Sequence, residues 1–144
     1  MTTLPATIPG LVRRGSPVID HAGDKMIACE LVPGIGARCL DGGKLHGYTF
    51  RSLSLDLTDP TGFHHALLWL AEKLGMDASA GVLWYWDAEW GTWYLQAKQR
   101  GRRYVIVDGR AVPCGAMEIP PASQEVSPTE ALRLAVLTVA GVEG

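Results

Sequence analysis

The sequence is poor in cysteine and in charge, and it lacks a long apolar run. Its three cysteines, Cys29, Cys39 and Cys114, have no C-x-x-C spacing, which argues against a disulfide framework and favours free thiols in a reducing cytoplasm. No charged-then-apolar leader opens the chain, and the longest apolar run is too short to cross a bilayer. We therefore expect a soluble cytoplasmic protein with no membrane partner.

The charge balance argues against a protein that binds duplex nucleic acid through an overall basic surface. Charged residues make up 19% of the chain and the net charge is -2, so no overall basic field exists that could hold duplex nucleic acid. In contrast, 47% of the 144 residues are hydrophobic, enough for one domain with a real core. We predict a single domain over residues 1–144, with a loose lead-in at 1–9 and a surface linker at 120–126.

Residues 81–110 contain four of the five tryptophans and the densest run of arginine. Period-two alternation and glycine-containing connections predict strands at 82–86, 92–98 and 103–107, and Asp108-Gly109 predicts a tight hairpin turn. These strands would form an antiparallel meander of three strands or four.

The alternation also assigns the aromatic rings to two faces of this meander. Trp84 and Trp93 fall on the face that is typical of a core, and Tyr85 and Tyr94 fall on the other. The rings either pack across the strands or form an exposed stacking platform for a partner. Six residues make up the candidate binding surface: Trp69, Tyr85, Tyr94, Arg100, Arg102 and Arg103.

Two helices are predicted, at 59–74 and 127–140. Asp59-Pro60 is a favourable start for the first, and Trp69 lies off its main apolar stripe, so this helix is either buried on two sides or meets a partner. Ser127-Pro128 opens the second, which is apolar nearly all round and would pack on the sheet or form a homodimer. The fold class is therefore α+β, with a mostly antiparallel sheet of about five to seven strands packed by two helices.

Motifs for catalysis and for metal or phosphate binding are missing. The adjacent His64 and His65 point about a third of a turn apart on a helix, and no histidine or cysteine pair has zinc-ligand spacing. Gly42-Gly43-Lys44 lacks the serine or threonine that a phosphate-binding loop requires after lysine. No nucleophile stands beside an identifiable base. We assign no catalytic residue, no metal and no cofactor.

The segment LDLTDPTGFHHALLWLAEKLG and the following VLWYWDAEWGTWYLQ combine a strand, a short helix and an aromatic hairpin. In this layout, about a third of the chain resembles small uncharacterised proteins encoded in phages and prophages. The resemblance implies an accessory protein that acts by binding, such as an inhibitor of a host or defence complex.

The sequence therefore predicts a non-enzymatic binding protein that meets a protein partner through its aromatic and arginine residues. One alternative is a module that binds a small anionic ligand, a nucleotide or single-stranded nucleic acid, with a pocket between sheet and helix. A small hydrolase is the second alternative.

Overall fold

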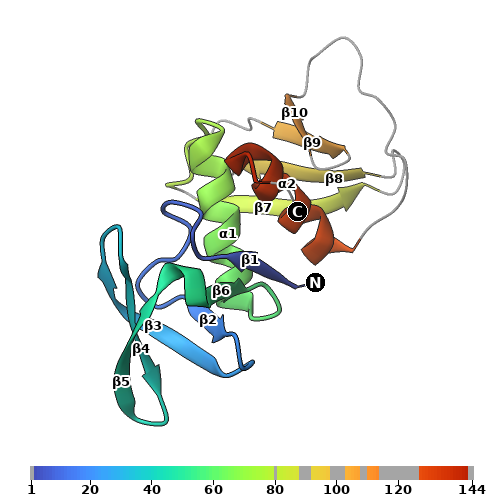
Figure 1. Ribbon diagram of the computed structural model, residues 1–144. Coiled ribbons are helices and arrows are strands. Elements are labelled where there is room, and N and C mark those ends of the chain that lie inside the picture. Colours follow the sequence, from blue (N-terminus) through green and yellow to red (C-terminus); the bar gives the residue numbers. More distant parts are fainter. Residues whose placement is uncertain are drawn as a thin grey trace. The chain divides into compact units, whose positions relative to one another are not determined.

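The computed structural model describes residues 2–79, 81–87, 92–97, 103–107, 110–113 and 127–142 (Figure 1). Where the sequence predicts one domain, these residues form two compact units, divided between Ala66 and Leu67. The α+β class is confirmed: the described residues contain two α-helices and two antiparallel sheets, of six and four strands, rather than a single sheet.

The first unit is built on the six-stranded sheet, whose strands follow the order β1-β6-β2-β3-β4-β5. The strands are β1 (Thr3–Pro5), β2 (Pro17–Asp20), β3 (Lys25–Val32), β4 (Gly36–Asp41), β5 (Lys44–Thr49) and β6 (Leu53–Asp56). A short 3-10 helix, η1 (Phe50–Ser52), separates β5 from β6. Figure 1 shows this sheet in blue to green.

Strand β1 corrects the loose lead-in predicted at residues 1–9. Leu4 pairs with Leu55 of β6, and Leu55 pairs in turn with Val18 of β2. All three side chains are 0% exposed, so they form a buried row across the sheet. Burial of these three aliphatic groups provides the favourable free energy that holds a three-residue strand in place.

Helix α1 (Pro60–Lys73) begins and ends where its capping residues predict. The Asp59 carboxylate accepts the amide hydrogen of Thr61 at 2.9 Å, which satisfies one free donor of the first turn. At the other end Gly75 adopts a φ of 73°, and the Met76 amide donates to the Ala71 carbonyl at 2.9 Å. The predicted first helix is thus confirmed.

The second unit contains a four-stranded antiparallel sheet in the order β10-β9-β8-β7. The strands are β7 (Val82–Asp87), β8 (Thr92–Ala97), β9 (Arg103–Val107) and β10 (Arg110–Pro113). The predicted meander is therefore confirmed, with the fourth strand present. The turn at residues 108–109 and the linker at 120–126 lie outside the described residues.

Helix α2 (Pro128–Ala140) contacts β10 within the second unit (Figure 1). Ser127 Oγ accepts the Glu130 amide hydrogen at 3.2 Å, in agreement with the predicted start of the helix, and Gly141 ends the helix at a φ of 73°. Leu132 and Val136 are fully buried, which confirms that the helix packs into the fold. The homodimer through this helix stays a prediction.

Among the described residues no helix has the length and apolarity to span a membrane.

Candidate ligand-binding groove

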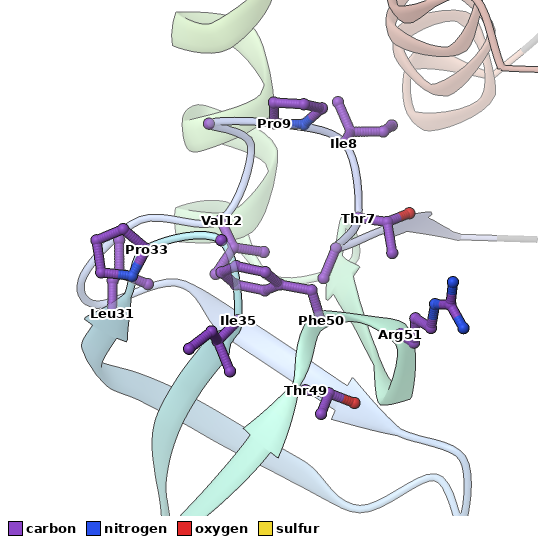
Figure 2. A pocket seen from close by; sticks show the side chains of 13 residues that line it. Thr7, Ile8, Pro9, Val12, Leu31, Pro33, Ile35, Thr49, Phe50 and Arg51 are labelled. Atoms are coloured by element: carbon purple, nitrogen blue, oxygen red, sulfur yellow. The ribbon is translucent and has the colours of Figure 1, made fainter.

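A half-open cavity of about 660 Å³ lies in the first unit, and we refer to it as the groove (Figure 2). It is lined by residues 6–10, 12, 31, 33–35 and 49–51. These belong to the loop after β1, the turn between β3 and β4, and the segment around η1. A volume of this size is typical of sites that bury small ligands.

Backbone hydrogen bonds fix the walls of the groove. The Ile8 amide donates to Pro5 and the Leu11 amide donates to Ile8, both at 3.2 Å, which folds the first loop into successive turns. The Phe50 amide donates to the Ile35 carbonyl at 3.2 Å, so η1 is tied directly to the β3–β4 turn. The groove is therefore formed by the fold itself and does not depend on a ligand to order its walls.

The groove has an apolar side and a polar side. In Figure 2 the Phe50 ring, Val12, Pro33 and Ile35 gather on one side of the view. The polar tips of Thr7, Thr49 and Arg51 lie on the opposite side.

Apolar side chains also surround the mouth of the groove. Ile35 is 65% exposed at the tip of the β3–β4 turn, and its neighbours Leu31 and Val32 are exposed as well. Turn tips usually carry polar residues or glycine, because these tolerate water and unusual backbone angles. Contiguous exposed apolar groups beside a cavity are typical of a surface that meets a ligand or partner.

The six residues of the predicted binding surface have different environments. Trp69 is 3% exposed and Tyr94 is 7% exposed, so the exposure predicted for these two is wrong. Trp69 is buried together with Ala66, Leu67, Leu70 and Ala71, so the buried surface of α1 is wider than a single stripe. Arg100 and Arg102 lie outside the described residues.

The structure brings three of these six residues together. The rings of Tyr85 and Tyr94 stack at 5.3 Å between centroids, and the exposed Arg103 guanidinium lies 5.8 Å from the Tyr94 ring centre. Tyr94 also forms a buried cluster with Val105, against which Tyr85 packs. This face of the sheet is therefore partly core, and Arg103 is an exposed residue beside it.

The tryptophans form a second aromatic group on β7 and β8. Trp84 stacks on Trp93 at 5.8 Å, and Trp86 meets Trp93 at 5.3 Å with a tilt of 58°. All three side chains are partly exposed, although the alternation places them on the face that is typical of a core. Cross-strand packing accounts for their arrangement.

Among the described residues Ser16 and His65 form a pair that resembles a nucleophile beside a base. Ser16 Oγ lies 2.7 Å from His65 Nδ1 and accepts the Arg13 amide hydrogen at 2.8 Å. The serine hydroxyl and the imidazole ring are therefore hydrogen-bonded to each other. Ser16 is 0% exposed and cannot meet a substrate. The pair instead ties the loop before β2 to α1.

This pair predicts a pH-dependent stability. Burial, aided by the charges of Arg13 and His64, lowers the pKa of His65. The unfolded chain then binds a proton more readily than the folded chain, so the free energy of unfolding should fall as the pH drops below about 6.5, the ordinary pKa of histidine. Chemical denaturation at several pH values measures this slope. His65→Asn should flatten it and the control His64→Asn should not; an unchanged slope in His65→Asn would contradict the assignment.

The thiol of Cys39 is unsuited to act as a nucleophile. Cys39 is fully buried, and burial together with the nearby Cys29 raises the pKa of its thiol, whereas a reactive cysteine needs a lowered pKa. Cys114 lies outside the described residues. Within the part of the chain that the structure describes, no three histidine, cysteine, aspartate or glutamate side chains cluster as metal ligands.

No protein-family model, curated protein or solved structure matches the chain. The resemblance to small phage-encoded proteins stays a prediction. The groove could not be predicted from the sequence, because the three segments that line it are distant from one another in the chain. One local signal pointed to it: the turn at Pro33-Gly34 is flanked by Val32 and Ile35, apolar residues where polar ones are usual.

Proposed function

We propose that this protein is a non-enzymatic binding protein, and that its ligand site is the groove of the first unit. The observation that carries the proposal is a preformed cavity of about 660 Å³ with one apolar side and exposed aliphatic residues at its mouth. Apolar walls with a few convergent polar groups are the usual character of a small-molecule site. This favours the small-ligand alternative over binding through the aromatic strands.

A neutral apolar fluorophore tests the site without involving charge. N-phenyl-1-naphthylamine should bind the protein with single-site saturation and a rise in fluorescence. Ile35→Ser removes an apolar wall residue and should weaken this binding roughly fivefold, because about 1 kcal/mol of apolar contact is lost. Since Ile35 is 65% exposed, the fold should tolerate the change.

The matched control is Leu45→Ser on β5, a similarly exposed aliphatic residue that does not line the groove. Both variants should melt within a few degrees of the parent protein. Probe binding that is absent from the parent, or equally weakened by Leu45→Ser, would contradict the proposed site.

A second candidate function is the accessory role implied by the phage resemblance, exercised on a protein partner. The partly exposed stack of Trp84, Trp86 and Trp93, with the exposed Arg103 nearby in the same sheet, favours it. Tryptophan and arginine contribute most to binding energy at protein interfaces.

A further inference from the structure

We infer that the ligand of the groove is a single-chain aliphatic carboxylate, with its carboxylate at Arg51 and its chain against Phe50 and Ile35. The inference rests on the proposed function and adds the chemical class of the ligand. It is carried by the charge of the groove and by the positions of its polar groups.

Arg51 carries the only charge among the described residues that line the groove. Its side chain is exposed, and within the described part of the chain no carboxylate forms an ion pair with it. Two other arginines differ, since Arg38 pairs with Glu30 and Arg133 pairs with Glu130. Among the described residues the guanidinium of Arg51 therefore has no anionic partner, and its planar fork fits a carboxylate.

Two hydroxyl groups accompany this charge. Thr7 and Thr49 line the groove, and Figure 2 shows both on the same side as Arg51. Among the described residues neither hydroxyl forms a hydrogen bond; the Ser52 hydroxyl donates to the backbone carbonyl of Thr49, not to its side chain. Both can donate to a carboxylate oxygen.

The opposite side of the groove has no charge and suits a hydrocarbon chain. Val12, Pro33, Ile35 and the Phe50 ring present only carbon atoms from their side chains. An aliphatic chain placed there removes apolar surface from water on both partners, the ligand and the wall. A ligand that satisfies both sides therefore needs an apolar chain and one anionic end.

This arrangement predicts a specific order of affinities for aliphatic ligands that differ only in their polar end. A chain with a carboxylate gains the apolar contact, the hydrogen bonds and the ionic attraction to Arg51, whereas an alcohol of equal length lacks the ionic attraction. A protonated amine of equal length is repelled by Arg51. Because Arg51 is exposed, the carboxylate's advantage should be about fivefold and should shrink as salt is added.

The experiment compares octanoate, 1-octanol and octylammonium as competitors that displace N-phenyl-1-naphthylamine from the protein at pH 7. Octanoate should bind roughly fivefold more tightly than octanol, and octylammonium should bind least. Arg51→Gln should abolish the difference between octanoate and octanol. Arg14→Gln, an exposed arginine of the same unit that does not line the groove, should preserve it.

The outcomes separate this inference from the proposed function. If the fluorophore binds and octanoate and octanol displace it equally well, the inference of a carboxylate ligand is overturned, while the groove remains the proposed site. Failure of the fluorophore to bind would overturn both. Binding to phosphatidylglycerol vesicles without binding of free octanoate would also overturn the inference, because the anion would then belong to a lipid surface.

Discussion

Leu55→Ala is expected to lower the free energy of unfolding by about 2–5 kcal/mol, the cost of removing a large aliphatic side chain from a closed core. Leu55 is 0% exposed and lies in β6, between Leu4 of β1 and Val18 of β2. The cavity left by the substitution cannot collapse easily, because hydrogen-bonded strands hold its walls on both sides. Stabilities of small domains are about 5–15 kcal/mol, so a large part of the total would be lost.

Urea denaturation measures this loss as a lower midpoint at an unchanged slope. Leu45→Ala is the matched control, since the same atoms are removed from an edge strand where the side chain is 42% exposed. The control should change the free energy of unfolding by less than about 0.5 kcal/mol. Equal losses for the two variants would contradict the buried row as the centre of the first unit.

Gly62→Ala is expected to destabilise the protein, although alanine is the better helix former by about 1 kcal/mol. Gly62 lies in the first turns of α1, and a β-carbon there would collide with the backbone carbonyl of Asp56. It would also lie 3.0 Å from Cγ of Pro17. A backbone carbonyl cannot rotate away as a side chain can, so helix and strand must separate, at a cost of about 1–3 kcal/mol.

Gly47→Ala provides the comparison, because a β-carbon at Gly47 would meet no atom within 4 Å. Alanine in a strand interior should be neutral or stabilising by roughly 0.5–1 kcal/mol, since glycine loses more backbone entropy on folding. Gly62→Ala should therefore lower the midpoint of urea denaturation, whereas Gly47→Ala should leave it unchanged or raise it. A Gly62→Ala protein as stable as the parent would contradict the close approach of α1 to β6.

The helices could be predicted from the sequence because their ends are encoded locally. Asp59 and Gly75 delimit α1, and Ser127 and Gly141 delimit α2, each through contacts that span a few residues. Strand β1 could not be predicted in this way. Its partner strand lies about fifty residues away, and three residues that end in proline carry no periodic signal.

The aromatic residues show a different limit of sequence analysis. Alternation correctly placed Tyr85 and Tyr94 together on one face of the second sheet. It could not show which face the rest of the fold would cover, because large rings are equally suited to a core and to an exposed platform. Trp69 was misplaced for a related reason: helical periodicity identifies the main buried stripe but does not show that a second side is also covered.

The groove depends entirely on tertiary structure, and its test must locate the ligand on the molecule. An NMR titration of the isotope-labelled protein with octanoate would follow the backbone amides and the indole N–H signals together. We predict that the largest shifts fall on Thr7, Ile35, Phe50 and Arg51, with the indole signals of the β7–β8 tryptophans unchanged. Shifts concentrated on those tryptophans, or no saturable shift at the groove residues, would contradict the groove as the binding site.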